Sequence, residues 1–295
     1  MKKIARIITI LTIVATLVLA AGLLSACNKN NDQTITVCAS DVPHAEVLNG
    51  IVKKLLEQKG YKLEVRILDW QEQNGAVASG DYDANYFQHL PYLVSGDFKD
   101  SLAFTCKVHY EPLGVYYGKA SAGTQVSDGT SFAICNDASN AVRALQLLEA
   151  NGVFSKASEQ NNYPITDGGE LAFSNDTWTS VSGVRVQLIA ENLLVASMSD
   201  YDFACLPCNT ALTGNVSADA NHRAAVESDP AQVVGKANGL AVRKADYKND
   251  ATYKAKIDAL TDALLSQDVA DFIAQQYNNV ILCNSQTQVD LRSEL

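Results

Sequence analysis

"TITVCASDVPHAEVLNGIVKKLLEQKG", residues 34–60, holds the two patterns on which the fold depends. Thr34–Ala39 is a short β-prone run, and the apolar residues from Ala45 to Leu56 then recur at helical spacing until Gly60. A strand that leads directly into an amphipathic helix is the repeating unit of α/β proteins with mostly parallel sheets. We therefore expect a layered α/β fold.

The same order of patterns returns along the chain. Residues 63–68 alternate like a strand, a short helix ends near Gly80, and 82–87 predicts the next strand. A second set begins with a strand over 131–135 and a helix over 141–150 that ends at Asn151-Gly152. Further strands are predicted over 184–189, 203–206 and 239–242, followed by two C-terminal helices. Two sets of units predict two lobes, with hinge crossings expected in 109–117 and 233–242.

The N-terminus has the features of an export signal. Lys2, Lys3 and Arg6 precede an apolar run over residues 7–24, which ends in Ser25-Ala26-Cys27. A membrane-spanning helix is the alternative, because this run approaches the length that crosses a bilayer. Small residues directly before a cysteine resemble a bacterial lipobox instead. We expect cleavage before Cys27, a lipid on its thiol, and a short polar linker to residue 33.

Charge and cysteine content limit the function classes. Without residues 1–26 the chain keeps 20 basic and 33 acidic residues, which disfavours nucleic acid and anionic membrane surfaces as partners. Beyond Cys27 there are six cysteines, whose pairing the sequence leaves open because buried free thiols fit equally well. They are Cys38, Cys106, Cys135, Cys205, Cys208 and Cys283.

One candidate ligand site follows the strand over 131–135. If Ser139 caps the next helix, Asn140 and Arg143 lie three residues apart on one face of its first turn. A helix N-terminus favours anions, and a guanidinium grips a carboxylate with two parallel hydrogen bonds. The simpler alternative is an ordinary N-cap with a solvated arginine.

A second candidate is "DANYFQHLPYL", residues 83–93, in which four rings crowd the end of a predicted strand. Tyr86 and Phe87 point to opposite faces of that strand, so one of them belongs to the core. The other, with His89 and Tyr92, would project where the strand ends. Rings with polar tips at such a place suit the wall of a ligand pocket.

Catalytic and metal-binding patterns are weak. Cys205-Leu206-Pro207-Cys208 follows a predicted strand, which allows an exported thiol oxidoreductase. With His44-Ala45-Glu46 it also partly matches a zinc deaminase signature, although Ala204 stands where that signature has proline. A metal site built from His44, His89 and His109 has no supporting spacing. Nucleophile elbows, phosphate loops and H-E-x-x-H are all absent from the sequence, so a binding protein is favoured over an enzyme.

Nearly the whole chain after the signal resembles the NlpA-type methionine-binding lipoproteins, the substrate-binding components of amino-acid ABC importers. The resemblance is carried by segments in the family's order: 37–48 is similar to "VGASPVPHAEIL", 83–93 to "DANFFQHKPYL", and 109–117 to "HYEPLGLYS". Residues 135–154 are similar to "PNDPTNxGRALLLLExxGLI", and 206–209 to the end of an "AVIN" strand.

The resemblance implies a two-lobed periplasmic-binding-protein (type II) fold, each lobe a mostly parallel sheet flanked by helices. It divides the chain into the signal peptide (1–26), the lipidated N-terminus and linker (27–33), lobe 1 (34–112), lobe 2 (113–236), and a return to lobe 1 with C-terminal helices (237–295). It implies a monomer anchored by Cys27 to the outer face of the cytoplasmic membrane, with a transporter permease and ATPase as partners and without a cofactor or metal.

The ligand implied by the resemblance is L-methionine. Arg143 matches the family arginine that holds the ligand carboxylate, with Asn140 beside it, and Asn209 matches an asparagine of the second lobe. The side chain would lie among aromatic residues that the family shares. The full expected set is Trp70, Tyr86, Phe87, His89, Tyr92, Asn140, Arg143 and Asn209.

Departures from the family pattern keep the ligand open. Cys135 and Ala138 replace family prolines, residues 165–185 match poorly, and the tail after Val280 differs. A methionine-containing dipeptide or another apolar amino acid is therefore the alternative ligand.

Overall fold

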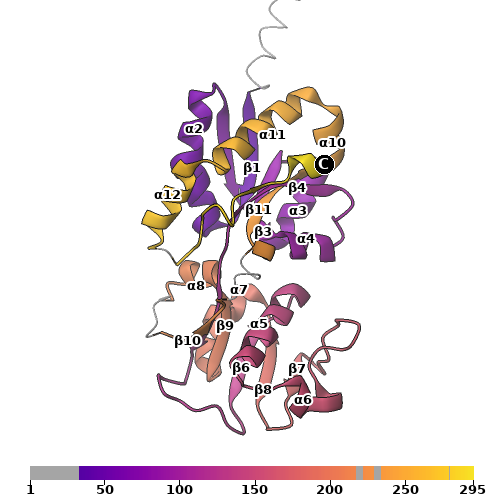
Figure 1. Cartoon of the computed structure of the whole chain (residues 1–295), viewed down its shortest axis with the longest axis vertical. Coiled ribbons are helices and arrows are strands. Elements are labelled where there is room, and N and C mark those ends of the chain that lie inside the picture. Colours follow the sequence, from indigo (N-terminus) through magenta and orange to yellow (C-terminus); the bar gives the residue numbers. More distant parts are fainter. Residues whose placement is uncertain (1–32, 217–221, 229–233, 279) are drawn as a thin grey trace, which may run out of the picture.

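The chain folds into two α/β lobes stacked along its long axis (Figure 1). The computed structural model describes residues 33–216, 222–228, 234–278 and 280–295. The predicted signal peptide, Cys27 and nearly all of the linker lie outside these residues, as does the first residue of the second predicted hinge crossing. Each lobe is built on one six-stranded sheet.

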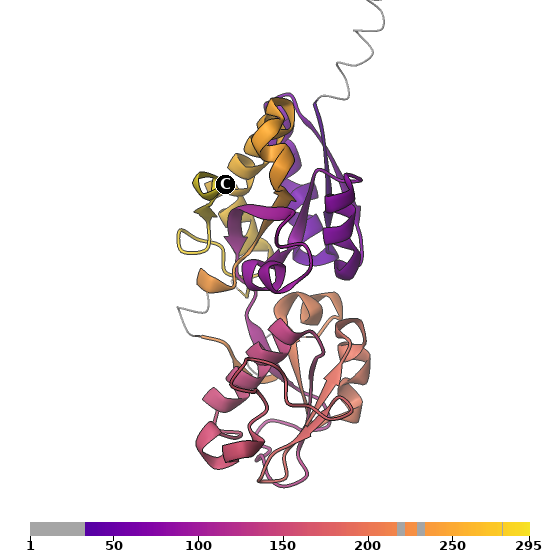
Figure 2. The same cartoon turned by 90° about the vertical axis from the view of Figure 1, so that its right-hand side faces the viewer.

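The first lobe has the strand order β12-β4-β11-β3-β1-β2, with helices on the sheet faces (Figures 1 and 2). Its elements are β1 (Thr34–Ala39), η1 (Asp41–Ala45), η2 (Leu48–Val52), α2 (Lys53–Gln58), β2 (Lys62–Ile67), α3 (Trp70–Ser79), β3 (Ala84–His89), α4 (Leu90–Ser95), β4 (Leu102–His109), β11 (Asn238–Arg243), α10 (Lys244–Asn249), α11 (Ala251–Leu264), α12 (Gln267–Gln276), β12 (Val289–Asp290) and η5 (Arg292–Glu294).

The second lobe has the strand order β10-β5-β9-β6-β8-β7. Its elements are β5 (Leu113–Tyr117), β6 (Ser131–Cys135), α5 (Ala138–Ala150), α6 (Lys156–Glu159), η3 (Gln160–Asn162), β7 (Thr177–Thr179), β8 (Arg185–Ile189), α7 (Glu191–Ser197), η4 (Met198–Asp200), β9 (Phe203–Pro207), α8 (Cys208–Thr213) and β10 (Arg223–Val226).

The two-lobed α/β prediction is confirmed, but both sheets are mixed rather than mostly parallel. β1 runs parallel to β2 and β3, whereas β11 is antiparallel to its neighbours β3 and β4. In the second lobe β6 is parallel to β8 and β9, and β5 is antiparallel to β9. β5 and β11 are the strands by which the chain enters each lobe from the other one. Both strands run away from the cleft, so they are antiparallel to neighbouring strands that run toward it.

Two predicted helices differ in their starts. The segment predicted over 45–60 divides into η1, η2 and α2, and η1 begins at Asp41 with one non-helical residue, Val42. Helix α5 begins at Ala138, because Asp137 and not Ser139 is its N-cap. Asp137 Oδ1 accepts a hydrogen bond from the Asn140 amide at 3.0 Å, which satisfies an amide that has no partner within the helix.

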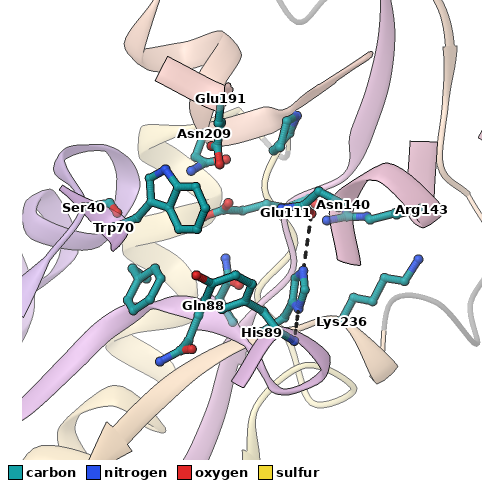
Figure 3. A pocket seen from close by; sticks show the side chains of 14 residues that line it. Ser40, Trp70, Gln88, His89, Glu111, Asn140, Arg143, Glu191, Asn209 and Lys236 are labelled. Carbon is teal, nitrogen blue, oxygen red and sulfur yellow. Dashed lines mark hydrogen bonds between the residues drawn. The ribbon is translucent and has the colours of Figure 1, made fainter. Parts of the chain in front are cut away.

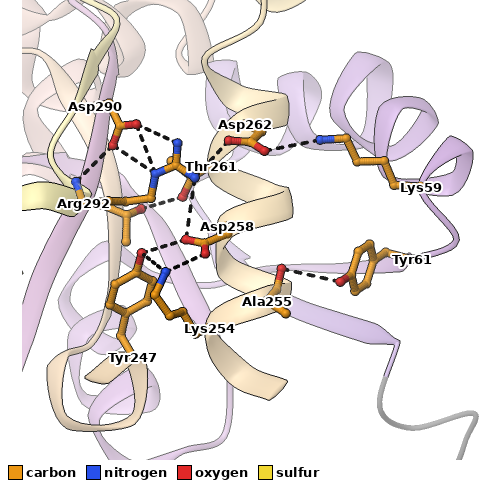
Figure 4. Close-up of polar contacts among 11 residues, drawn as sticks. Lys59, Tyr61, Tyr247, Lys254, Ala255, Asp258, Thr261, Asp262, Asp290 and Arg292 are labelled. Carbon is orange, nitrogen blue, oxygen red and sulfur yellow. Dashed lines mark hydrogen bonds and ion pairs between the residues drawn. The ribbon is translucent and has the colours of Figure 1, made fainter. Parts of the chain in front are cut away.

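The C-terminal segment is fixed to the first lobe by polar contacts with α11 (Figure 4). Arg292 Nη1 lies 2.9 Å from Asp262, and its Nη2 pairs with Asp290 at 2.6 Å. Within the core, the hydroxyls of Thr105 on β4 and Thr261 on α11 lie 2.8 Å apart. Among the described residues, no helix is both long and apolar enough to cross a membrane.

Candidate functional site

A cavity of about 60 Å³ lies between the lobes, where the carboxyl ends of several strands meet the two crossings of the chain. Figure 3 shows side chains from both lobes converging on it. Its lining consists of Ser40, Trp70, Phe87, Gln88, His89, Tyr92, Glu111, Asn140, Arg143, Glu191, Pro207, Asn209, Lys236 and Asn238.

Seven of the eight residues that the sequence indicated lie at this cavity: Trp70, Phe87, His89, Tyr92, Asn140, Arg143 and Asn209. They come from segments as far apart as α3 and α8, and the fold brings them together. The lobes also touch here, because His89 Nε2 on lobe 1 lies 3.4 Å from Asn140 Oδ1 on lobe 2.

The eighth residue, Tyr86, does not line the cavity, which corrects the predicted set. Its ring is fully buried in the first lobe, and its hydroxyl pairs with His109 Nδ1. Successive side chains of a strand face opposite sides, so burial of Tyr86 in the core turns Phe87 toward the ligand side. Phe87 is the member of the pair that lines the cavity.

Three aromatic rings form one continuous wall. The rings of Trp70 and Tyr92 are 5.4 Å apart, and those of Phe87 and Tyr92 are 6.0 Å apart, both edge to face. Local capping positions them: Asp69 caps α3 by accepting from the Gln71 amide, which places Trp70 at the first helical position. The result is an apolar slot with polar tips.

His89 is held neutral at the end of this wall. Its Nδ1 accepts a hydrogen bond from the Tyr92 amide at 3.1 Å and so caps α4. Burial, together with the positive charge of Arg143, lowers the pKa of His89 to about 4. The imidazole therefore presents a neutral nitrogen to Asn140 near neutral pH.

Arg143 is buried and paired, which excludes the alternative of a solvated arginine. Its exposed fraction is 3%. Its Nε donates to both carboxylate oxygens of Glu227, at 2.7 and 2.8 Å, and its Nη2 donates to the carbonyl of Glu111. Burial opposes its charge, but the hydrogen bonds and charge of Glu227 raise the pKa of Arg143. The same pair keeps the pKa of Glu227 below its usual value despite burial.

Glu227 ties this arginine to both crossings between the lobes. It accepts a hydrogen bond from the Tyr110 hydroxyl at 2.5 Å and from the Leu113 amide at 3.0 Å. Lys236 Nζ lies 3.5 Å from its other oxygen. Because Tyr110 and Leu113 belong to one crossing and Lys236 to the other, the cluster fixes Arg143 beside the hinge.

Two of the three histidines considered as metal ligands, His44 and His109, lie close together beside the carboxylate of Glu111. His89 is not part of this cluster. His109 Nε2 lies 2.7 Å from Glu111 Oε1, and His44 Nε2 lies 3.3 Å from the same oxygen. All three are buried. Burial lowers the pKa of His44 to about 3, while the neighbouring histidines hold the pKa of Glu111 below its usual value despite burial. The geometry is that of a hydrogen-bonded support for Glu111 at the cavity floor.

The second metal-type cluster in the described part of the chain joins Cys135, Asp137 and Glu191. The Cys135 thiol lies 2.8 Å from Asp137 Oδ2, and burial raises its pKa. Neither of the two clusters contains Cys205 or Cys208, so the deaminase pattern is not assembled.

The C-x-x-C pair lacks the environment of a redox catalyst. Cys205 and Cys208 are both buried and free, as are the other cysteines of the described residues apart from the half-buried, free Cys283. Burial raises the pKa of the Cys205 thiol and brings that of Cys208 to about 12. Thiol exchange needs an accessible thiolate with a lowered pKa.

Sequence reasoning missed half of the lining, including Glu111, Glu191, Lys236 and Asn238. A signal was present for two of these residues. Glu191 comes two residues after β8, and Glu111 comes two residues after β4, which is where ligands gather in open α/β sheets. Lys236 and Asn238 lie on the return crossing and carry no comparable pattern.

Comparison with known proteins agrees with this architecture. The sequence matches the NlpA lipoprotein family over residues 35–283. It is 30% identical over 281 residues to the methionine-binding lipoprotein MetQ of Bacillus subtilis, covering 91% of this chain and 96% of that protein.

Solved structures give the same result. A nutrient-binding protein from Burkholderia cenocepacia bound to methionine superimposes with a TM-score of 0.71 at 30% identity, covering 85% of this chain and 99% of that one. A periplasmic substrate-binding protein of an ABC transporter from Coxiella burnetii gives a TM-score of 0.68 at 26% identity, over 85% of this chain and 100% of that one.

Proposed function

This chain belongs to the NlpA lipoprotein family, and from that premise we propose that it captures L-methionine, or a close analogue, and delivers it to an ABC importer. Its relatives support an exported, membrane-associated protein with a solute-binding role. The methionine assignment draws on the methionine-binding lipoprotein of Bacillus subtilis and the methionine-bound protein of Burkholderia cenocepacia.

The observation that carries the proposal is the division of the cavity into a charged end and an aromatic wall. In Figure 3, Arg143 and Lys236 lie on one side and Trp70 on the other. An amino acid has the same division, with a charged backbone and an apolar side chain. A thioether is polarisable and packs well against ring edges such as those of Phe87 and Tyr92.

The size of the cavity supports a single amino acid. A site needs about 10–15 Å³ of such space for each water, so 60 Å³ corresponds to about four to six waters. At about 30 Å³ of liquid per water, this is the bulk of one medium-sized amino acid. Closure of the lobes about the crossings would then bury the ligand and form the surface that the transporter recognises.

Anchoring through Cys27 completes the proposed role. A lipid on the first residue after cleavage, followed by a short polar linker, would hold the protein at the outer face of the cytoplasmic membrane near its permease and ATPase. The protein would act as a monomer there, because one chain supplies both walls of the cavity.

Calorimetry on ligand-stripped protein tests the ligand. We expect L-methionine to bind with micromolar or tighter affinity, about −8 kcal/mol or stronger. Mass spectrometry of the small molecule that co-purifies gives an independent identification. If neither L-methionine, D-methionine nor methionyl dipeptides give heat, the ligand assignment is wrong while the fold stands.

A methionine-containing dipeptide is the second candidate, and one feature favours it. A neighbouring cavity of about 330 Å³ shares Ser40, Trp70, Glu191 and Asn209 with the first one and extends it toward Asp41 and Asp69. A second residue of the ligand would pass Trp70 into this space. Tighter binding of a methionyl dipeptide than of L-methionine in the same calorimeter would select this alternative.

A further inference from the structure

Glu191 is a carboxylate at the cavity whose strongest charged neighbours, among the described residues, are acids. It begins α7 on lobe 2, is half-buried, and accepts a hydrogen bond from the Thr210 hydroxyl at 2.6 Å. The charged groups that act most strongly on it are Asp137, Glu111 and Asp69, all acids. Burial and these like charges raise the pKa of Glu191 to about 7, despite the hydrogen bond from Thr210.

The other charged groups of the cavity have neighbours that favour their charged forms. Arg143 is paired with Glu227, and the pKa of Glu111 stays below its usual value despite burial. Glu191 also lies on the ligand side of the cleft, near Asn209 in Figure 3. A half-buried carboxylate among other acids is costly to ionise unless a cation lies beside it. The cavity therefore offers a place for a positive group at this point.

We propose that Glu191 binds the α-ammonium group of the amino-acid ligand, while Arg143 binds its carboxylate. This rests on the proposed function. A carboxylate oxygen of Glu191 and one of Asp137 lie within 4.8 Å of each other. Asp137 Oδ2 also accepts a hydrogen bond from Asn140 Nδ2 at 3.0 Å. Asn140 precedes Arg143 by one helical turn. The ammonium and carboxylate sites are thus neighbours, as the two charges of one zwitterion require.

A metal ion is the competing occupant, because Cys135, Asp137 and Glu191 could supply three ligand atoms. A metal would have to displace the proton of the Cys135 thiol, which is donated to Asp137 and whose pKa burial raises. An ammonium group needs no deprotonated thiol. It also supplies three donors to the carboxylates and to the side-chain oxygen of Asn209, which lacks a hydrogen-bond partner.

The test is a thermodynamic cycle between protein and ligand, measured by calorimetry at pH 8. L-methionine and 4-(methylthio)butanoate, which lacks only the amino group, are titrated into the wild type and Glu191→Gln. We expect the wild type to prefer methionine by at least about 30-fold, the scale of a hydrogen bond to a charged group, and Glu191→Gln to lose most of that preference.

Glu72→Gln is the matched control, because it makes the same change at an exposed acid of α3 that lines neither cavity. It should keep the preference for methionine. Circular dichroism should show that Glu191→Gln folds, since glutamine removes a destabilised charge.

Three outcomes overturn the inference. If methionine binds and Glu191→Gln keeps the full preference, Glu191 does not hold the ammonium, although the proposed function stands. If zinc chloride binds the wild type but not Cys135→Ser, the cluster is a metal site instead. If methionine does not bind, the cycle is run with whichever standard amino acid does, against its own des-amino analogue. Absence of binding by all of them overturns both proposals.

Discussion

Arg143 combines a proposed contact with the ligand and an ion pair within the protein. Its guanidinium is held from behind by Glu227 while it lines the cavity in front. A lysine keeps the charge but loses the planar fork with which Nε and Nη2 hold Glu227. If Arg143 also binds the ligand, substitutions there change both binding and stability, so variants must be designed to separate the two effects.

We predict that Arg143→Lys weakens L-methionine binding by about 10- to 100-fold, because a charge-assisted contact from the guanidinium is lost. Arg143→Ala should in addition lower the free energy of unfolding by about 3–5 kcal/mol, since Glu227 is left buried without a partner. Calorimetry measures the first effect and urea unfolding the second.

The double variant Arg143→Met with Glu227→Gln is the control. It removes both charges together and should recover much of the lost stability without recovering binding. Recovery of methionine affinity in this variant would place the ligand carboxylate elsewhere.

His44 makes the protein sensitive to acid. Its pKa is lowered to about 3 by burial, against an ordinary value near 6.5. Below pH 6.5 the unfolded chain gains a proton there that the folded protein does not take up. Stability from this group is therefore complete above pH 6.5 and is lost as pH falls toward 3, by about 1.4 kcal/mol per unit.

We expect urea unfolding of His44→Gln to lose about 2 kcal/mol less stability than the wild type between pH 7 and pH 5. The groups that face His44 are Glu111, His109, Tyr86 and Asn238. Glu191 has the opposite effect: because its pKa is raised, the protein loses stability from this group as pH rises from about 4.5 to 7. The wild type and His44→Gln both retain Glu191, so its contribution cancels in the comparison. His222→Gln removes an exposed histidine as the control, and equal slopes for His44→Gln and the wild type would contradict the prediction.

At the scale of single elements, β11 is the strand that returns the chain to lobe 1. It pairs with β3 on one side and β4 on the other, and its register shifts beside Gly239. A Cβ at Gly239 would overlap the Cys106 carbonyl oxygen and the Phe104 ring of β4. Glycine is thus required by close approach in the middle of the sheet.

Gly239→Ala should therefore lower the free energy of unfolding by about 2–4 kcal/mol, measured by urea denaturation. Gly96→Ala is the matched control: its nearest neighbours stand at ordinary contact distance, 3.6 Å or more, and its backbone is extended. The control should change stability by less than about 0.5 kcal/mol. Equal effects of the two substitutions would show that the sheet can accommodate a Cβ at Gly239 and contradict the prediction.

For the whole molecule, the proposed ligand would couple the two lobes. Because it would contact both walls of the cavity, L-methionine at 100 times its Kd should raise the free energy of unfolding by about 2.7 kcal/mol. Calorimetric scans at increasing methionine should show a rising Tm in one transition. Arg143→Lys should need a higher methionine concentration for the same rise in Tm, in proportion to its weaker affinity. Two separate transitions, of which methionine raises only one, would contradict binding between the lobes.

Export is a second property of the whole chain. Cys27→Ser should leave the protein without incorporated labelled palmitate and shift it out of the membrane fraction. Cys283→Ser serves as the control, since that cysteine is half-buried in the folded lobe. Unchanged labelling of Cys27→Ser would place the lipid on another residue.

The sequence by itself determined the alternation of strands and helices, the two lobes, and seven residues of the cavity wall, because these depend on local periodicity and on patterns at strand ends. It did not determine whether Tyr86 or Phe87 faces the ligand: alternation puts them on opposite faces but does not say which face is the core. It also missed that Asp137 caps α5, since Asp137 and Ser139 are equally good capping residues.

Only the tertiary structure decided the charge pattern of the site. Arg143 and its partner Glu227 are 84 residues apart, and His44 meets His109 and Glu111 across the first lobe. Such pairs leave no local signal, because a salt bridge depends on where two chain segments meet and not on their spacing. The acidic surroundings of Glu191 are visible for the same reason only after every neighbouring charge has been placed around it.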